Sequence, residues 1–333
     1  MPKFCPFKFL LVTLLTLGFA SLSHAEWYKD EQAIMGTSIR AEVWSTDAEK
    51  AQAGIRAVMQ EMHRIDYLMS PFKEDSELSR INREAADHPV KISRELFDLI
   101  DRSLHFSRIS DGVFDITFSS VGYLYDYRAG IAPSDTDIAK TLPGINYRHL
   151  ILNPRDSTIK FERKGMRIDL GGIAKGYAVD KCIAILSAMG FHQALVTAGG
   201  DSRLLGDRDG RPWMIGIRDP RKKAGEAAVV IPLSDTAIST SGDYERFFIR
   251  DGVRYHHILN PKTGKSALNS RSATVIGPDA TTTDALTKPL FILGWEKGMQ
   301  LLESLPGIEA VVIDNTGQIH YSSGLEPPRP AVQ

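Results

Sequence analysis

The residues with the greatest chemical potential lie in a glycine turn between a predicted strand and a predicted helix. Asp169 lies near the end of the strand, Gly171 and Gly172 form the turn, and Lys175 lies early in the helix. Two glycines let the backbone approach a ligand closely, and a helix start presents free N–H groups and a partial positive charge. With the charge of Lys175, this segment suits a diphosphate. It also fits a tight structural turn with a solvated lysine, because the glycine spacing is not the dinucleotide fingerprint.

A carboxylate among apolar residues forms a second candidate. Asp115 follows Phe114 in the segment Gly112–Thr117. Burying such a carboxylate is costly unless a donor satisfies it, and either a ligand's N–H or hydroxyl or a backbone turn would do so. Three tyrosines that could stack on an aromatic ring, or belong to the core, follow at positions 123, 125 and 127.

Two further polar groups could contribute to a site. His256 and His257 are adjacent, and neighbouring side chains of a strand point to opposite faces, so a two-histidine metal centre is not expected. Thr240 and Ser241 could cap a helix or bind a phosphate.

A carboxylate and a lysine are spaced to share one face of a helix. Asp284 and Lys288 lie four residues apart, which also fits an ordinary surface ion pair. Pro289 removes one backbone hydrogen bond from that helix, normally at a cost of about 3 kcal/mol. A first helical turn that faces a ligand or a cation would account for this loss.

The elements that must position these residues predict an α+β fold. Helices are expected over 48–68, 93–110, 174–189 and 284–293. Strands are expected over 38–44, 159–161, 167–170, 194–197, 213–218, 228–232, 237–240, 272–276, 308–314 and 319–322. The segments 159–161 and 167–170 are expected to pair as a hairpin, as are 308–314 and 319–322. Antiparallel-looking pairs with inserted helices argue against a doubly wound sheet, and no linker or repeat divides the chain.

The N-terminal residues predict that the protein is exported, and the C-terminal residues predict a disordered tail. Residues 1–25 combine two lysines, an apolar run and the small residues Ser23 and Ala25, which is typical of a cleaved signal peptide. The run is too short to span a membrane. Its removal leaves a formal charge of −3, which provides no broad field for nucleic acid. It also leaves Cys182 without a disulfide partner, and Cys182 is expected in the core. Residues 326–333 are predicted to be a disordered proline-rich tail.

In this order, the motifs resemble the FAD:protein FMN transferase family, also called the ApbE family, from about Trp27 to about Ser322. The matching segments are Met35–Thr37, Met69–Phe72, Ser79–Asn82, Gly112–Thr117, Asp169–Asp180, Gly199–Asp201, Trp213–Pro220, Ser239–Glu245, His257–Gly264 and Asp284–Gly294. The resemblance implies an ApbE-type single domain over 26–325, with a T-fold-like core of mainly antiparallel sheet and inserted helices. It also implies an exported protein of the bacterial periplasm.

The activity that the resemblance implies is transfer of FMN from FAD to a serine or threonine hydroxyl of an exported or membrane redox protein. AMP is the leaving group, and Mg²⁺ assists. Asp284, Lys288 and His257 are the expected catalytic residues, and the proton acceptor could be Asp284, Asp243 or His257. The metal is expected on the Gly172 carbonyl and Asp284, near Thr287 and Lys288. The FAD site is expected to comprise Met35, Phe72, Val113, Phe114, Asp115, Asp169, Lys175, His257 and Ile258.

Three residues depart from the family pattern. Phe72 stands where a tyrosine is common, and Tyr125 where a tryptophan is common. Lys288 stands where a metal-binding threonine is usual, and a protonated lysine cannot donate a lone pair to Mg²⁺ and would repel it. Either Lys288 points at the diphosphate and shares the work of the cation, or the metal site is altered or absent.

Two other functions fit the same residues. In an Mg²⁺-dependent FAD pyrophosphatase, water would replace the protein hydroxyl and FMN would be released free. In a non-catalytic periplasmic flavin-binding protein, FAD would bind and no AMP would form. The sequence alone does not separate these functions from the transferase. The pyrophosphatase differs from it only in the nucleophile, and the binding protein differs only in catalysing no reaction.

Overall fold

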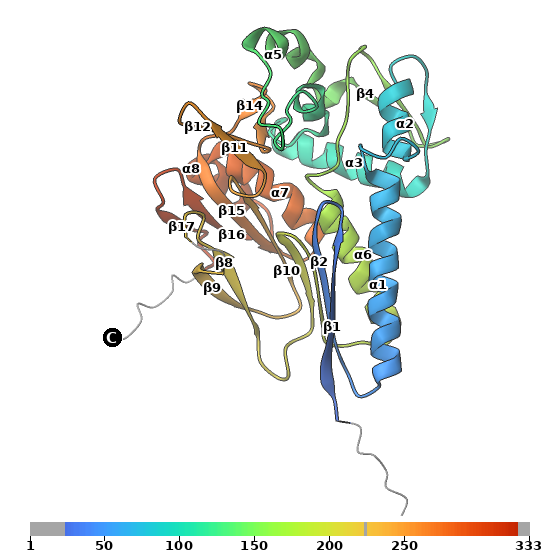
Figure 1. Ribbon diagram of the computed structural model, residues 1–333, viewed down its shortest axis with the longest axis vertical. Coiled ribbons are helices and arrows are strands. Elements are labelled where there is room, and N and C mark those ends of the chain that lie inside the picture. The colour runs from blue at the N-terminus through green and yellow to red at the C-terminus, as the bar shows by residue number, and fades with distance from the viewer. Residues whose placement is uncertain (1–23, 223–224, 326–333) are drawn as a thin grey trace, which may run out of the picture.

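An eight-stranded antiparallel sheet runs through the residues that this computed structural model describes, 24–222 and 225–325 (Figure 1). Its strands follow the order β1-β2-β6-β7-β10-β15-β16-β17. Their bounds are β1 Glu26–Ile34, β2 Thr37–Ser45, β6 Ala194–Ala198, β7 Asp201–Leu205, β10 Ala237–Gly242, β15 Ser270–Gly277, β16 Glu309–Asp314 and β17 Ile319–Tyr321. The α+β expectation of a mainly antiparallel sheet with inserted helices is confirmed. The predicted tail and all but His24 and Ala25 of the predicted signal peptide lie outside the described residues.

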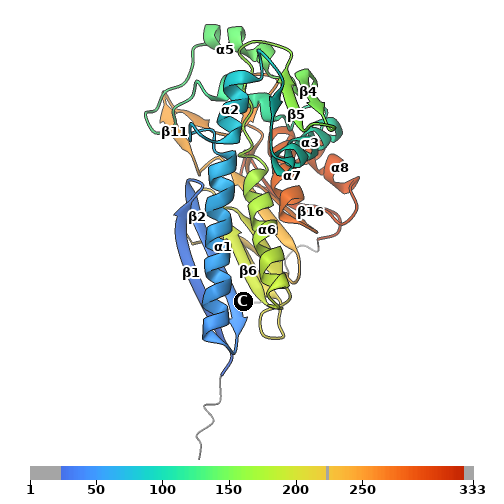
Figure 2. The same ribbon diagram turned by 90° about the vertical axis from the view of Figure 1, so that its right-hand side faces the viewer.

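Helices cover one face of this sheet. The long helix α1 (Ala48–Met69) packs beside α6 (Ala174–Ala188), as Figure 2 shows, and α6 packs against α7 (Ala280–Leu293). Asp47 caps α1 by accepting a hydrogen bond from the Lys50 N–H. Cys182 is buried between α6 and α1, as expected for a core residue.

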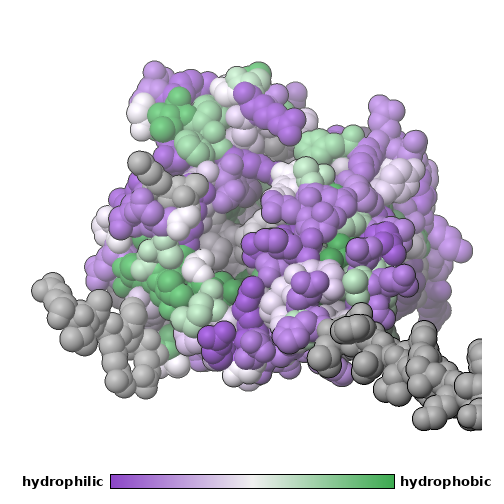
Figure 3. All heavy atoms as spheres, turned by 60° about the horizontal axis from the view of Figure 1, so that its bottom comes forward, coloured by the Kyte–Doolittle hydropathy of each residue, from purple (hydrophilic) through white to green (hydrophobic). Residues whose placement is uncertain are grey.

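The other face of the sheet carries a separate hairpin. Strands β8 (Trp213–Arg218) and β9 (Ala227–Leu233) pair with each other, and their buried residues Ile217, Val229 and Ile231 pack on Ile238 and Ile276 of the main sheet. Figure 3 shows one face of the molecule, which is mostly hydrophilic and carries a few hydrophobic patches.

A smaller, largely helical part lies at the top of Figure 1, above the sheet. It contains α2 (Glu77–Glu84), α3 (Arg94–Ile109), α4 (Ser119–Gly122), α5 (Asp135–Thr141) and a sheet of β3 (Val90–Lys91), β5 (Thr158–Phe161) and β4 (Leu150–Asn153). The hairpins β11 (Phe247–Arg250) with β12 (Val253–His256) and β13 (Leu259–Asn260) with β14 (Lys265–Ser266) lie beside it. The N-terminal end of α6 faces this part, so the glycine turn lies where the two parts meet (Figure 1).

Two predictions about local structure are wrong. Arg167–Leu170 is not a strand, because the backbone of Ile168 bonds to the side chain of Asn82 through both its N–H (2.8 Å) and its carbonyl (2.9 Å). The strand at 159–161 pairs instead with β4 and β3. Helix α7 begins at Ala280, where Asp279 caps it, and not at Asp284, so Pro289 lies well inside the helix.

Candidate active site

The site is built where α6 and α7 come into close contact. A Cβ added at Gly176 would lie 2.0 Å from the Ala280 carbonyl oxygen and 2.8 Å from the Asp284 Cβ. Because only a glycine fits there, the first turn of α6 can lie directly against the second turn of α7. The Gly176 N–H then donates to Asp284 Oδ2 at 3.1 Å. The predicted glycine segment and the predicted Asp284 segment are therefore brought together.

Two lysines and two carboxylates form an alternating ionic cluster at this contact. Lys175 Nζ pairs with Asp201 and lies 3.7 Å from Asp284 Oδ2, and Lys288 Nζ pairs with Asp284 Oδ1. The side chain of Asp284 is fully buried, and that of Lys288 is 17% exposed. Asp284 and Lys288 therefore share one helix face as predicted, but the surface interpretation of the pair is wrong.

The charges in this cluster set the pKa values of its carboxylates in opposite directions. Burial alone would raise the pKa of Asp284, but Lys175 and Lys288 lower it below its ordinary value. Burial and the nearby Asp284 raise the pKa of Asp201, against the effect of Lys175. Asp284 is therefore held as a carboxylate between two ammonium groups.

Buried hydroxyl groups connect α7 to the sheet. Thr287 Oγ1 lies 2.8 Å from Ser241 Oγ and donates to the Asp284 carbonyl at 2.7 Å, while Ser239 Oγ lies 2.8 Å from Thr283 Oγ1. Ser241 lies in β10, as does Thr240, which bonds to Thr274. The interpretation of Thr240 and Ser241 as a helix cap is therefore wrong, since the strand places them against α7 and β15.

The two predicted aspartates of the FAD site are satisfied within the protein. Asp115 accepts from Thr117 N–H (2.8 Å), Thr117 Oγ1 (2.6 Å) and Tyr147 N–H (2.8 Å), so a local turn provides two donors and a distant backbone N–H the third. Asp169 accepts from the Gly171 N–H at 2.6 Å, which shapes the glycine turn. Burial raises the pKa of both carboxyl groups.

The two histidines have separate environments, as expected for neighbours at a strand end. His256 is buried, lies 2.7 Å from the Ala267 carbonyl through Nε2, and packs edge-on against Phe291. His257 Nδ1 is buried and has no hydrogen-bond partner in the described structure. Burial, together with the charges of Arg246, His256, Lys288 and Lys175, lowers the pKa of His257 to about 3. His257 is therefore neutral at neutral pH and has an unused ring nitrogen.

This low pKa predicts acid sensitivity. In the unfolded chain His257 takes up a proton as the pH falls below about 6.5, whereas the folded protein keeps it neutral down to about pH 3. The free energy of unfolding should therefore decrease across that window, since the unfolded state binds more protons. We expect the melting temperature of His257→Gln to depend less on pH than that of the wild type. The control His63→Gln, at an exposed position, should show the same pH dependence of the melting temperature as the wild type. An equally steep pH dependence in His257→Gln would contradict the low pKa of His257.

The apolar residues expected in the FAD site differ in exposure. Val113, Phe114 and Ile258 are buried, and Phe114 lies 3.4 Å from the Cβ position of Gly172. Met35 lies in the β1–β2 turn with a positive φ of 54° and is partly buried. Phe72 is 87% exposed, and no contact places it against the ionic cluster.

The expected metal ligands do not form a divalent cation site in this arrangement. Mg²⁺ needs oxygen ligands in near-octahedral geometry at about 2.0–2.1 Å. Both Asp284 oxygens already bind N–H donors, Thr287 Oγ1 faces the Asp284 carbonyl and Ser241, and Lys288 lies beside Gly172. Within residues 24–222 and 225–325, no group of three or more His, Cys, Asp and Glu side chains could hold a metal ion.

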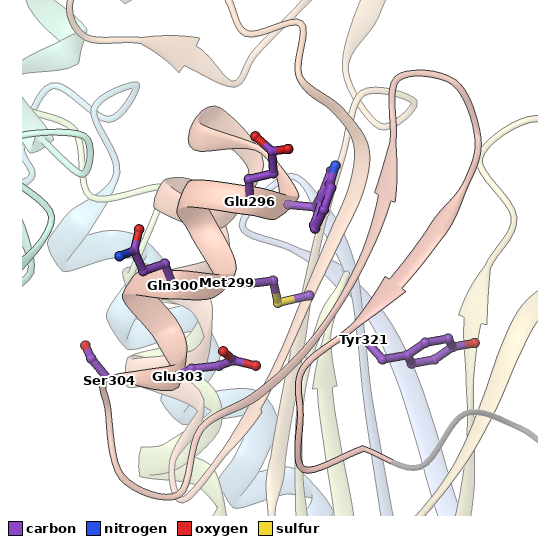
Figure 4. A pocket seen from close by; sticks show the side chains of 7 residues that line it. Glu296, Met299, Gln300, Glu303, Ser304 and Tyr321 are labelled. Atoms are coloured by element: carbon purple, nitrogen blue, oxygen red, sulfur yellow. The ribbon is translucent and has the colours of Figure 1, made fainter.

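A hollow lies away from these residues, between α8 (Trp295–Glu303) and β17, as Figure 4 shows. It has a volume of about 500 Å³, which would suffice for a small ligand. Its lining comprises Trp295, Glu296, Met299, Gln300, Glu303, Ser304 and Tyr321. Because it holds two glutamates and no lysine or arginine, it does not suit a diphosphate.

Two charged residues of the site were not predicted as site residues, although the first, Asp201, lies in the matching segment Gly199–Asp201. Asp201 starts β7 directly after Gly199 and Gly200, and this placement of a carboxylate after a glycine pair was a usable signal. Arg246 bonds to the Gly36 carbonyl at 3.3 Å, and its own carbonyl accepts from the His257 N–H at 3.2 Å. No pattern around Arg246 indicates this position, because it depends on the loop between β10 and β11.

This chain is similar to known proteins over nearly its whole length. The sequence model of the ApbE family matches residues 35–312. A FAD:protein FMN transferase of Treponema pallidum is 33% identical over 90% of this chain and 87% of its own length, and one of Vibrio cholerae is 31% identical over 84% and 85%. The ApbE protein of Thermotoga maritima superimposes with a TM-score of 0.82 at 34% identity, covering 90% of this chain and 97% of that one. The flavinyl transferase ApbE of Pseudomonas stutzeri, in its apo form, superimposes with a TM-score of 0.77 at 28% identity, covering 90% of this chain and 95% of that one.

Proposed function

The chain belongs to the ApbE family and is a FAD:protein FMN transferase, and from this premise we propose how its residues carry out the reaction. FAD binds at the glycine turn before α6, with its diphosphate near Lys175 and Lys288. The FMN half moves to a serine or threonine hydroxyl of an exported or membrane redox protein, and AMP leaves. The observation that carries this proposal is the meeting of that turn with the Asp284–Lys288 pair.

The transfer forms one P–O bond and breaks another. The acceptor oxygen attacks the phosphorus on the riboflavin side of the diphosphate, and the bridging bond to the AMP phosphate breaks in line with it. The hydroxyl proton passes to a base, and the bridging oxygen leaves with AMP. Lys175 and Lys288 stabilise charge on the phosphate oxygens, and Asp284 positions both lysines.

Among the three possible proton acceptors, His257 is favoured. Asp243 is held by Arg221 at 2.8 and 2.5 Å and lies 3.8 Å from Arg254, and Asp284 is held by two lysines. His257 alone is neutral with an unused nitrogen. A bound diphosphate would offset the cations around it and raise its pKa toward a useful value.

The exposed Phe72 supports a role in flavin binding, since a large apolar side chain with 87% exposure has no packing role to explain it. We expect Phe72→Ala to weaken FAD binding about tenfold, as loss of a ring stack would, without a change in melting temperature. Fluorescence titration with FAD measures the affinity. Met214→Ala, which removes an apolar side chain that is 64% exposed, serves as a control and should bind FAD as the wild type does. Equal affinity of the two variants would exclude Phe72 from the FAD site.

The Gly172 carbonyl, Asp284 and Thr287 were the expected magnesium ligands, and the proposed reaction does not use them to hold a metal. The steps above use no metal, because Lys288 lies where the cation was expected. The remaining FAD residues, Met35, Val113, Phe114, Asp115, Asp169 and Ile258, stay predictions.

Export to a bacterial periplasm is part of the proposal. It is supported by the composition of residues 1–25 and by the proposed acceptors, which are exported or membrane proteins. In the described part of the chain, no helix combines the length and apolar character needed to cross a membrane.

A purified protein assay separates the transferase from its two rivals. The mature enzyme is incubated with FAD and an exported redox protein that carries a candidate threonine. Transfer predicts flavin fluorescence that stays with the acceptor after denaturation, with one AMP released for each flavin attached. Free FMN would indicate a pyrophosphatase, and bound FAD without any AMP would indicate a flavin-binding protein.

A further inference from the structure

A lysine ammonium lies beside the carboxylate that was expected to hold a divalent cation. Lys288 Nζ contacts Asp284 Oδ1 and also donates to the Asp284 backbone carbonyl at 3.0 Å. Its Cε lies 3.3 Å from the Cβ position of Gly172, so the ammonium end of the side chain lies between α7 and the glycine turn. Asp284 of α7 and Gly172 of the glycine turn, which were both expected to bind the metal, thus lie next to Lys288.

The second oxygen of Asp284 is also taken. Oδ2 accepts from the Gly176 N–H at 3.1 Å and lies 3.7 Å from Lys175 Nζ. A dication bound at Asp284 would therefore have to displace Lys288 and would lie close to a second ammonium group. Both steps are unfavourable, since like charges repel strongly in a buried setting.

We propose that the Lys288 ammonium takes the place of the divalent cation, so that this enzyme transfers FMN without Mg²⁺. The inference rests on the proposed transferase function and specifies its cation. An ammonium group has three N–H donors, and Asp284 accepts two of them, which leaves the third for a diphosphate oxygen. Lys175 and Arg246 add positive charge nearby, which helps to offset the lower charge of lysine compared with Mg²⁺.

Cation binding tests the proposal without reference to turnover. The mature enzyme is treated with EDTA, dialysed, and titrated with Mg²⁺ by calorimetry, both alone and saturated with FAD. We expect the wild type to show no saturable Mg²⁺ binding beyond the Mg²⁺ that FAD binds by itself. Its melting temperature should not rise with added Mg²⁺. Lys288→Thr removes the ammonium and supplies a hydroxyl, so it should gain one Mg²⁺ site. Lys297→Thr makes the same substitution at an exposed position of α8 and should behave as the wild type does.

Activity provides the second arm. With FAD and the acceptor protein present, chelated wild type should release AMP at the same rate with and without added Mg²⁺. Lys288→Met, which keeps the length of the side chain, should release AMP about 100-fold more slowly than the wild type, as when a single charge-stabilising donor is removed. Lys288→Thr should be active only with Mg²⁺.

Saturable Mg²⁺ binding by the wild type, or AMP release that requires Mg²⁺, would overturn the proposal and leave the transferase function standing. Absence of AMP release and flavin transfer in the wild type under every metal condition would instead overturn the transferase function. Calorimetry would still decide whether Lys288 excludes the cation in that case.

Discussion

Asp284→Asn is expected to lower the rate of AMP release from FAD in the presence of the acceptor protein by about 10²–10³-fold, the range seen when one preorganised electrostatic contact is removed. The amide keeps the size of the carboxylate but removes the charge that holds Lys288 and Lys175 in place. Its NH₂ group would also face an N–H donor, either Gly176 or a lysine. FAD binding should largely survive, because both lysines remain available to the diphosphate.

The same substitution should reduce stability. Breaking a buried ion pair by removing one partner costs about 3–5 kcal/mol. Asp314→Asn is the matched control, since Asp314 is a buried carboxylate that pairs with His320 on the far strands β16 and β17. That variant should be less stable and should keep wild-type turnover per folded molecule. Wild-type turnover in Asp284→Asn would remove Asp284 from the mechanism.

Gly176→Ala is expected to have the second large effect. A methyl group there would lie 2.0 Å from the Ala280 carbonyl oxygen, which is backbone and cannot turn away. Overpacking typically costs about 1–3 kcal/mol, and a backbone clash between two helices should reach or exceed the upper end. Helices α6 and α7 would have to separate, which would also move Lys175 away from Asp284. We therefore expect a lower melting temperature together with a large loss of AMP release.

Helix propensity makes the opposite prediction, since alanine favours a helix by about 1 kcal/mol over glycine. Ser187→Ala on the same helix is the control, because Ser187 is exposed and the new residue is the same. Its unfolding free energy should stay within about 0.5 kcal/mol of the wild type. A Gly176→Ala variant as stable and active as Ser187→Ala would show that the close contact of α6 and α7 is not needed.

The helices and inner strands could be predicted from sequence where one face is apolar. Helix α1 begins at the predicted residue, and Ser93, at the predicted start of α3, is its N-cap. Edge strand β1 was missed because its residues are mostly exposed and carry no apolar alternation. The short helices α2 and α8 were also missed, and α2 has eight residues with only three buried.

The chemistry of the site could be predicted only in part. The glycine turn and Asp284 were identified from residue types and order, and the structure brings them together at Gly176. The burial of the Asp284–Lys288 pair could not be predicted, because four-residue spacing fixes a shared helix face but not what covers it. The start of α7 was placed late, since the threonines before Asp284 resemble a loop, whereas Asp180 of α6 accepts from the Ala280 and Thr281 N–H groups.

The central claim is that the turn before α6 and the Asp284–Lys288 pair together cleave the diphosphate of FAD and pass FMN to a protein. The most direct measurement is the intact mass of an exported redox protein that carries a candidate threonine, co-expressed with this enzyme. We predict a mass increase equal to one esterified FMN with the wild type and none with Asp284→Asn. An unmodified acceptor beside folded, FAD-binding wild type, or equal modification by both enzymes, would contradict the claim.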